Sequence, residues 1–191
     1  MADQYLLVSW RNYHTLSQKL AAGILSAKNP PDIIVAISRG GLTLGHVLSD
    51  HLRIPVSTIA IQSYRDIQAQ GEVVLTEKLK TPVHGKHVLL TDDVADSGKT
   101  LQRADGYLHR FRPKEISTVT MFLKPTSAVR PDYFVRQTTK WIIFPYESTE
   151  MILLITQKMT REGKTKRDIQ LLLERVGFTD EQIAFVRKHY L

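Results

Sequence analysis

The sequence predicts an α/β protein, in which a parallel twisted sheet is flanked by helices and followed by a helical C-terminal extension. Short apolar runs of strand type alternate with segments of helical periodicity. Polar, glycine-containing loops follow two of the apolar runs, where the carboxyl ends of parallel strands would meet. From Thr149 to Leu191 only helical patterns remain. We therefore expect an α/β domain over residues 1–148 and a helical extension over residues 149–191.

The first half of the chain gives two helices and two strands. Trp10–Leu25 carries an apolar stripe at helical spacing, and Asn29-Pro30-Pro31 ends that helix. Asp32–Ile37 is short and rich in isoleucine, which favours a buried strand. Leu42–Leu52 returns to a helical pattern, and Pro55–Ile61 is again of strand type.

The middle of the chain repeats this alternation after a long polar stretch. The stretch from Gln62 to Gly85 has weak periodicity, and within it Glu72–Thr76 suits one arm of a hairpin. Strands are then predicted at His87–Leu90 and Ile116–Leu123, with the helix Leu101–Arg110 between them. A loop as long as this polar stretch is usually functional or disordered, and a surface excursion without function stays equally open.

The extension is expected to form three helices. Glu150–Arg161 and Lys166–Val176 have helical spacing, and Gly177 is a typical stop. Thr179 then suits the N-cap of a last helix, because acidic residues fill the first turn that follows it. Core packing, a dimer contact and a lid are all open roles for this segment.

Composition excludes several classes of protein. The chain has 191 residues, of which 42% are hydrophobic and 24% charged, as in an ordinary globular protein. It has no cysteine, which excludes disulfides and thiolate catalysis. No apolar run reaches membrane-spanning length and no signal peptide is evident, so we expect a cytoplasmic protein with no membrane partner. A net charge of +7 suits a nucleic acid and a phosphorylated substrate equally, but a charge spread along the chain in this way is more often a solvated surface than a nucleic-acid footprint.

The string Val88–Thr100 is the most informative part of the sequence. An apolar run reaches two adjacent carboxylates, Asp92 and Asp93, and a small-residue loop then opens onto a helix. The N–H groups of such a turn hold phosphate, and the acids hold ribose hydroxyls or a magnesium ion. The loop comprises Ala95, Asp96, Ser97, Gly98, Lys99 and Thr100.

Two other interpretations of this string were weighed. Gly98-Lys99-Thr100 matches the end of a nucleotide-binding P-loop, but that motif needs a glycine where this chain has Asp93. A carboxylate inside a phosphate cradle would repel the ligand, which excludes the P-loop. A buried strand followed by a polar turn of no function is the second alternative.

The string resembles the motif for 5-phosphoribosyl 1-pyrophosphate (PRPP) in type I phosphoribosyltransferases, and further segments resemble the purine branch of that family. The resemblance implies the type I fold. It also implies that the loop Ala95–Thr100 holds the 5′-phosphate and that Asp92 and Asp93 bind the ribose hydroxyls. Magnesium is the expected cofactor, with Asp93 and Asp92 as its candidate ligands. Asp96 would contact N7 of the purine as general base or acid.

Ser38-Arg39-Gly40-Gly41 places an arginine beside two glycines after a predicted strand. Backbone N–H groups with a guanidinium suit a diphosphate, although a plain tight turn is as good an interpretation of these residues alone. In the family that the chain resembles, the matching loop binds pyrophosphate and often has a cis peptide bond, here between Ser38 and Arg39. Ser38, Arg39 and Gly40 are therefore expected to bind PRPP.

The resemblance also assigns a loop and a lysine. Ser63-Tyr64 matches the pair that begins a flexible hood loop, which closes over the active site in related enzymes. Lys124 follows an apolar strand, and a lysine at the matching place donates to the oxygen at C6 of the base. Without this context, a lysine at such a place is more commonly a surface residue whose charged end extends into water.

Trp141 begins the second informative string, Trp141–Glu147. This segment resembles the base-binding strand of xanthine-guanine phosphoribosyltransferases, in which the tryptophan stacks on the purine. The backbone from Ile142 onward would read the base at C2. Ile143 stands where an acidic residue is common, which leaves the preference among guanine, xanthine and hypoxanthine open. Trp10, by contrast, is expected to be a packing residue of its helix and not part of the site.

The resemblance as a whole implies an enzyme of purine salvage. It would transfer phosphoribose from PRPP to N9 of guanine, xanthine or hypoxanthine, giving the nucleoside 5′-monophosphate and pyrophosphate. A homodimer or homotetramer is expected, and nucleic acid is not an expected partner. Two alternatives remain: a PRPP-binding regulator of transcription or of RNA on the same fold, and an adenine phosphoribosyltransferase.

Overall fold

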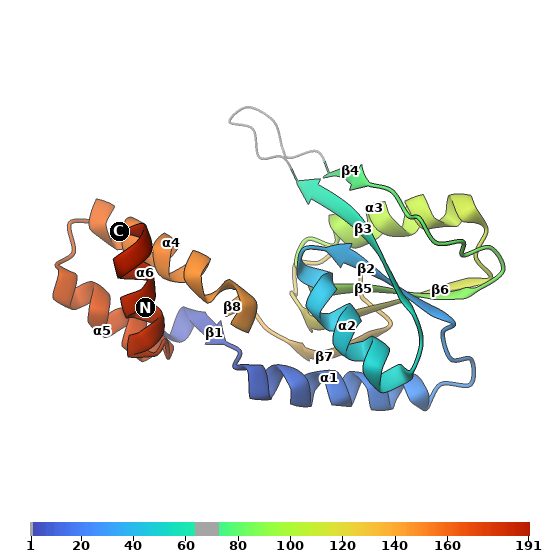
Figure 1. The fold of residues 1–191 in the computed structure, drawn as a ribbon, viewed down its shortest axis with the longest axis horizontal. Helices are drawn as coiled ribbons and strands as arrows, with labels where there is room; N and C mark the ends of the chain where they lie inside the picture. Colours follow the sequence, from blue (N-terminus) through green and yellow to red (C-terminus); the bar gives the residue numbers. More distant parts are fainter. Residues whose placement is uncertain (1, 64–72) are drawn as a thin grey trace. The chain divides into compact units, whose positions relative to one another are not determined.

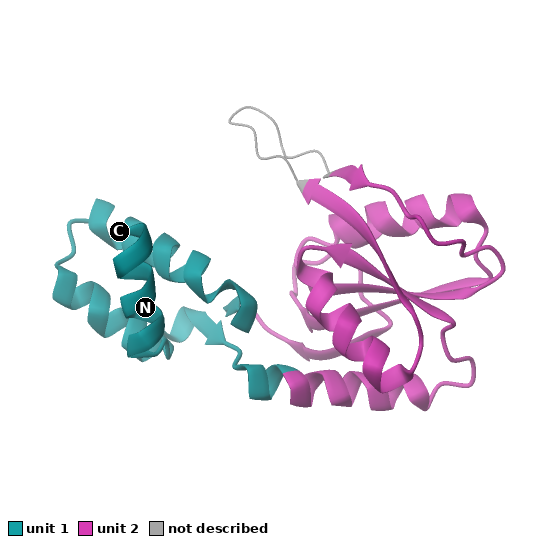
Figure 2. Cartoon of the chain, in the orientation of Figure 1, with its two compact units in different colours: residues 1–13, 140–191 teal, residues 14–139 magenta. Residues whose placement is uncertain are grey.

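The computed structural model describes residues 2–63 and 73–191 (Figure 1). By its contacts the chain divides into two compact units, shown in Figure 2. Unit 1 comprises Met1–Tyr13 and Lys140–Leu191, and unit 2 comprises His14–Thr139. The predicted boundary between residues 148 and 149 stays a prediction. None of the helices in the described ranges has the length and apolar content needed to span a bilayer.

Unit 2 is built on a six-stranded sheet of order β4-β3-β2-β5-β6-β7 (Figure 1). Neighbouring strands are parallel except for β4, which runs antiparallel to β3. The mostly parallel sheet was predicted, and so was the hairpin arm at β4. The strands are β2 (Ile33–Ser38), β3 (Val56–Ser63), β4 (Val73–Glu77), β5 (His87–Ala95), β6 (Glu115–Leu123) and β7 (Tyr133–Gln137).

The helices of unit 2 cover both faces of this sheet. Right-handed crossovers from β2 to β3 and from β5 to β6 run in opposite directions along the sheet, so their helices lie on opposite faces. Leu101 and Leu108 of one helix pack into a core cluster with Val35. The backbone of the other helix at Gly45 lies against Ala36. The helices are α1 (Trp10–Leu25), which begins in unit 1, α2 (Gly40–Leu52), α3 (Lys99–Leu108) and the short 3₁₀ helix η2 (His109–Phe111).

Strand β5 is longer than the sequence predicts. The apolar pattern ends at Leu90, but pairing with β6 continues through Asp92 opposite Thr120 and Val94 opposite Phe122. The two acids therefore lie within the strand rather than after it. Backbone pairing with a buried neighbour maintains strand geometry beyond the apolar residues, which is a tertiary effect.

Unit 1 joins a two-stranded parallel sheet to three helices. β1 (Tyr5–Leu7) pairs with β8 (Trp141–Ile143). Ile143 packs into a core cluster with Ile152, Leu173 and Ile183 of the helices. All three predicted helices are present, and Thr179 accepts a hydrogen bond from the Gln182 N–H, as an N-cap does. The helices are α4 (Ser148–Arg161), α5 (Lys166–Val176) and α6 (Asp180–Tyr190), with the 3₁₀ helices η1 (Ala2–Gln4) and η3 (Pro145–Glu147).

Candidate functional site

The two predicted phosphate loops meet at the point where the strand order of unit 2 reverses. From β2 the chain crosses to β3 on one side, whereas from β5 it crosses to β6 on the other. Ligands of open α/β sheets bind at the carboxyl edge of such a switch point. The Ser38–Gly41 loop follows β2, and the Ala95–Thr100 loop follows β5. The sheet thus brings these loops to one edge.

A contact between Gly40 and Asp93 joins the Ser38–Gly41 loop directly to the acids of β5. A Cβ atom on Gly40 would lie only 2.5 Å from Cγ and 2.6 Å from Oδ1 of Asp93. Gly40 is also the first residue of α2, so the Asp93 carboxylate lies at the positive end of that helix. The peptide bond between Ser38 and Arg39 is cis, as the resemblance predicted. The Ser38–Gly41 loop and the acids of β5 therefore form one site.

The adjacent acids face opposite sides of the sheet. Side chains alternate along a strand, so Asp93 lies on the α2 face and Asp92 lies on the α3 face. Asp92 is 9% exposed, and its Oδ1 accepts a hydrogen bond of 3.0 Å from the Asp93 N–H. Burial raises the pKa of Asp92 well above its ordinary value, and the negative charge of Asp93 raises this pKa further. A cation or hydroxyl donors bound here would stabilise the charged form.

The Ala95–Thr100 loop is held from outside by the segment that follows β6. The Ala128 N–H donates to the Ser97 carbonyl at 3.1 Å. Gly98 has a positive φ of 81° and caps α3. A Cβ atom on Gly98 would lie 2.8 Å from the Val129 nitrogen and 2.9 Å from Ser127 Oγ. The loop therefore accepts glycine only at this position, for conformation and for space.

Lys124 belongs to the same arrangement. It directly follows β6, is partly buried, and its N–H donates to the Ala95 carbonyl at 2.9 Å. Asp96 and Lys99 of the loop are exposed. Unit 2 thus positions the predicted lysine, acids and phosphate loop at one edge of its sheet.

Sequence reasoning missed the residues that hold the loop. Ser127 Oγ donates to the Val129 carbonyl at 2.7 Å, which closes the turn against Gly98. No motif marks these residues, because their role depends on the pairing of β5 with β6. The turn-like run Pro125-Thr126-Ser127 is the one sequence signal that could have indicated them.

The predicted base-binding residues of the second string belong to unit 1. Trp141 begins β8 and is 57% exposed, so its ring is free of the core. Ile142 is 8% exposed, and Ile143 is fully buried in the core cluster of unit 1. The apolar residue at position 143 is therefore a core residue here. Trp10 is 58% exposed, although its ring also contacts the Tyr13 ring, so the expected helix packing is incomplete.

Of the pair that begins the predicted hood loop, the structure describes only Ser63. Ser63 is the last residue of β3, and Tyr64 lies outside the described residues. The closing loop that begins at this pair stays a prediction.

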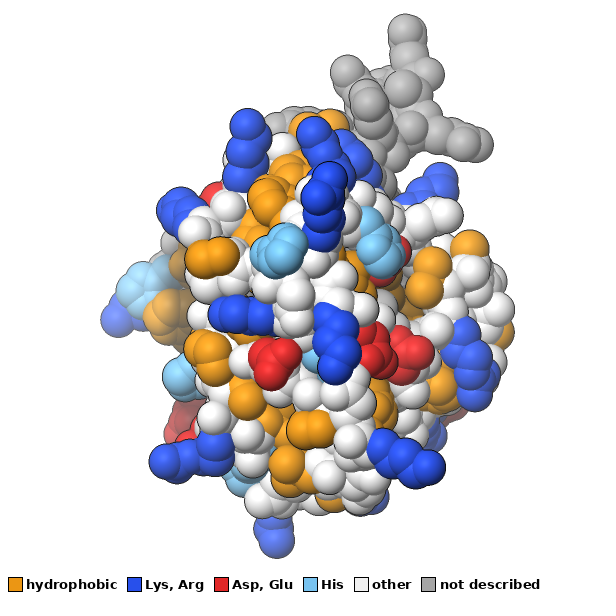
Figure 3. All heavy atoms as spheres, turned by 90° about the vertical axis from the view of Figure 1, so that its right-hand side faces the viewer, with side chains coloured by type: hydrophobic (Ala, Val, Ile, Leu, Met, Phe, Trp, Pro, Cys, Tyr) orange, Lys and Arg blue, Asp and Glu red, His pale blue; other side chains and the backbone are white. Residues whose placement is uncertain are grey.

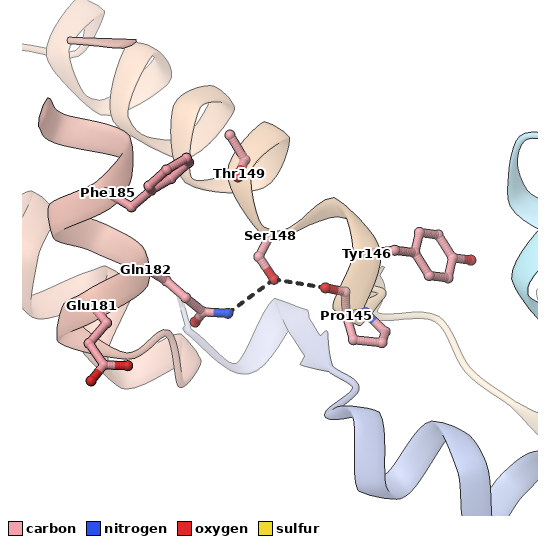
Figure 4. A pocket seen from close by; sticks show the side chains of 7 residues that line it. All are labelled: Pro145, Tyr146, Ser148, Thr149, Glu181, Gln182 and Phe185. Carbon is pink, nitrogen blue, oxygen red and sulfur yellow. Dashed lines mark hydrogen bonds between the residues drawn. The ribbon is translucent and has the colours of Figure 1, made fainter. Parts of the chain in front are cut away.

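Two surface features lie apart from these residues. In Figure 3 the Lys and Arg side chains of one face are scattered among hydrophobic, uncharged and a few acidic side chains. A hollow of about 320 Å³ lies in unit 1 between η3, the start of α4 and α6 (Figure 4). There Ser148 Oγ accepts from Gln182 Nε2 and donates to the Pro145 carbonyl, each at 3.3 Å. This hollow contains none of the predicted site residues.

The fold and the edge of its sheet define a class of protein, an α/β enzyme for a phosphorylated sugar. Residues 9–150 match the model of the phosphoribosyl transferase domain family. The chain belongs to this family, which confirms the resemblance and the predicted type I fold.

Individual relatives cover most of the chain. It is 30% identical to the xanthine-guanine phosphoribosyltransferase of Idiomarina loihiensis, over 76% of this chain and 89% of that protein. It is 26% identical to xanthine phosphoribosyltransferase 1 of Saccharomyces cerevisiae, over 78% of this chain and 92% of the relative. Among solved structures, the purine phosphoribosyltransferase from Pyrococcus horikoshii is similar with a TM-score of 0.69 and 32% identity. That similarity covers 75% of this chain and 94% of the other.

Proposed function

We propose that this purine phosphoribosyltransferase transfers the phosphoribosyl group of PRPP to N9 of guanine, xanthine or hypoxanthine in purine salvage. The products are the nucleoside 5′-monophosphate and pyrophosphate. The observation that carries the proposal is the contact of Gly40 with Asp93, which joins an arginine loop to a pair of acids beside a phosphate loop. The names of the relatives support a purine as the acceptor. Nothing in them favours a regulator or an adenine-specific enzyme.

The Ala95–Thr100 loop and the Ser38–Gly41 loop suit the two phosphate groups of PRPP. We assign the 5′-phosphate to the Ala95–Thr100 loop, because the N-terminus of α3 lies within it and offers N–H groups and a favourable dipole. We assign the pyrophosphate to Ser38, Arg39 and Gly40, where an exposed guanidinium stands before the first turn of α2. Asp92 and Asp93 lie between these loops and would bind the ribose hydroxyls.

The two acids also suit magnesium. Mg²⁺ takes one or two carboxylates together with substrate phosphate oxygens and water. Among residues 2–63 and 73–191 no cluster of three metal-ligating side chains exists. The resemblance assigns Asp93 and its sequence neighbour Asp92 as the ligands that the protein would supply. The bound ion would neutralise charge on the pyrophosphate. A bound cation would favour the ionised form of Asp92 and so oppose the burial that raises the pKa of this carboxyl.

Proton transfer is assigned to Asp96. It follows β5 directly and is exposed at the same edge, where it could reach N7 of a purine bound above the ribose. A carboxylate there can take a proton from the base as the new bond to N9 forms. Arg39 stabilises the charge on the departing pyrophosphate.

The resemblance assigns contacts with the base to Lys124 of unit 2 and, separately, to Trp141 and the backbone at Ile142 of unit 1. The exposed ring of Trp141 offers a stacking surface. Lys124 can donate to an oxygen at C6 but finds no acceptor in the amino group of adenine, which favours 6-oxopurines. Ser63 and Tyr64 would begin the loop that closes over this site.

The assignment of Lys124 is tested by Lys124→Met, with Lys114→Met as the matched control. Lys114 is exposed and lies just before the amino end of β6, whereas Lys124 follows its carboxyl end. A charged hydrogen bond contributes about 1.5 to 3 kcal/mol, so kcat/KM for hypoxanthine should fall roughly 10- to 100-fold in Lys124→Met. The slow rate with adenine should not fall. An equal loss with both bases, or no loss, would remove Lys124 from base selection.

Three further assignments are proposals of the same kind. We propose that residues 1–148 form the catalytic domain and residues 149–191 a helical extension, since the family match ends at residue 150. A cytoplasmic location and a homodimer or homotetramer are likewise proposed. Size-exclusion chromatography with light scattering would test the oligomer.

A further inference from the structure

A groove in the helical part of unit 1 lies beyond the residues that the family model matches. The match ends at residue 150, whereas every residue that lines the groove lies between 156 and 191. The groove has a volume of about 1100 Å³ and is formed by α4, α5 and α6. This exceeds the roughly 300 to 1,000 Å³ of an ordinary small-molecule site. Its size suits a segment of another protein.

One continuous face of α6 lines the groove along the whole helix. The lining positions follow the spacing i, i+3, i+4, i+7, i+8 and i+11, which is a single helical stripe. An 11-residue helix is about 16 Å long, so the stripe could contact about three turns of a second helix. The stripe consists of Asp180, Ile183, Ala184, Arg187, Lys188 and Leu191.

The floor of the groove is apolar. Ile169 of α5 is 5% exposed and Ile183 of α6 is 1% exposed, and both line the groove beside Ala184. Both isoleucines belong to the core cluster of unit 1, so the exposed apolar surface of the groove comes from Ala184 and from Leu191, which is 61% exposed. An apolar strip of this kind accepts the nonpolar face of an amphipathic helix.

The rim of the groove is basic. Lys166 and Arg167 come from the first turn of α5, and Arg187 and Lys188 come from the last turn of α6, against one lining acid, Asp180. Cations in the first turn of a helix oppose its dipole, so the pair on α5 does not serve the stability of that helix. A surface of this charge favours an acidic partner.

We propose that this groove docks an acidic amphipathic helix of a partner protein. Its nonpolar face would cover Ala184 and Leu191, the exposed apolar residues of the groove, and its carboxylates would pair with the four cations on the rim. A nucleic acid fits less well. Asp180 and Glu181 at the start of α6 would repel its phosphates, and the apolar side chains of Ala184 and Leu191 would stay uncovered.

The test uses the full-length protein and a synthetic probe. The probe is a fluorescein-labelled peptide of about fifteen residues with leucines on one helical face and glutamates on the other. Fluorescence anisotropy should show saturable binding that weakens with salt. A counterpart with glutamine in place of glutamate should bind at least about tenfold more weakly.

Variants locate the binding. Arg167→Glu combined with Arg187→Glu should weaken binding of the glutamate probe at least about tenfold. Arg175→Glu makes half of this charge change, equal to one of the two substitutions, at an exposed position of α5 outside the groove and should change affinity less than about twofold. Ala184→Gln fills the floor without changing charge and should weaken binding severalfold. Phosphoribosyl transfer should be unchanged in all of them, which separates this proposal from the proposed function.

Several outcomes would overturn the proposal. These are absence of saturable binding, equal loss in Arg175→Glu and in the double variant, or unchanged affinity in Ala184→Gln. A short single-stranded RNA that binds more tightly than the probe, and is released by the double variant, would overturn it in favour of a nucleic-acid surface.

Discussion

Replacement of Gly98 by alanine tests how the phosphate loop is held. Gly98 has a φ of 81°, in the left-handed region where a residue with a Cβ costs roughly 1 to 2 kcal/mol. The new Cβ would also lie 2.8 Å from the Val129 nitrogen and 2.9 Å from Ser127 Oγ. The first of these is a backbone atom, so the loop or the 124–129 segment must shift, at about 1 to 3 kcal/mol. The free energy of unfolding should fall by about 2 to 5 kcal/mol in total.

Gly85→Ala is the matched control for this variant. Gly85 has a φ of 70°, but a Cβ there would meet nothing within 4 Å. It should lose only the conformational part, about 1 to 2 kcal/mol. Urea unfolding of both variants measures the difference, and initial rates measure KM for PRPP. Each 1.4 kcal/mol of lost phosphate binding would raise that KM about tenfold in Gly98→Ala.

Two results would refute this reasoning. Equal losses of stability in Gly98→Ala and Gly85→Ala would show that Ser127 and Val129 do not confine the loop. An unchanged KM for PRPP in a folded, destabilised Gly98→Ala protein would show that the loop does not hold the 5′-phosphate.

Three other changes test individual side chains. Asp96→Asn should lower kcat about a hundredfold or more without loss of stability. The control Asp50→Asn, at an exposed position of α2, should leave kcat unchanged. Normal turnover in Asp96→Asn would contradict the role of Asp96 in proton transfer. Because the pKa of Asp92 is raised above 3.8, the folded protein releases this proton later than the unfolded chain as pH rises, so stability falls. Asp92→Asn should therefore gain stability relative to wild type from about pH 4 upward in urea unfolding, with no gain at lower pH, and a constant difference at all pH values would contradict this. Trp141→Ala should raise KM for the base about 10- to 100-fold through lost stacking, whereas Trp10→Ala, equally exposed, should not, and equal effects would remove the stacking role.

Elements with a strong local pattern could be predicted from the sequence. The apolar stripe of α1 and the proline stop after it give Trp10–Leu25 with the bounds that the structure has. The N-cap at Thr179 is likewise local, because a threonine followed by Asp180-Glu181-Gln182 satisfies the first N–H groups of α6 without help from other elements. Such signals depend on neighbours in sequence alone.

Three strands have no clear local pattern in the sequence, although the resemblance indicated a strand at Trp141. The short strands β1 and β8 have three residues each and exist because they pair with one another. β7 is only partly buried, so it lacks a clear apolar pattern. These strands gain their geometry from tertiary contacts, which outweigh the weak propensity of a short segment.

For the candidate site, the residues could be predicted from the sequence but their arrangement could not. Its residues could be found because they stand in contiguous strings after predicted strands. Their arrangement could not, because the contact of Gly40 with Asp93 depends on β2 and β5 being neighbours. The burial of Asp92 on the α3 face also needs the strand to continue past Leu90.

The most direct test of the account is pyrophosphate release from PRPP and magnesium, with hypoxanthine, guanine, xanthine, adenine and uracil offered separately. Turnover is expected with one or more of the three 6-oxopurines, and little or none with adenine or uracil. The relative rates of the three would also settle the preference that Ile143 leaves open. Binding of PRPP without turnover on any base, or turnover on adenine or uracil alone, would contradict the account.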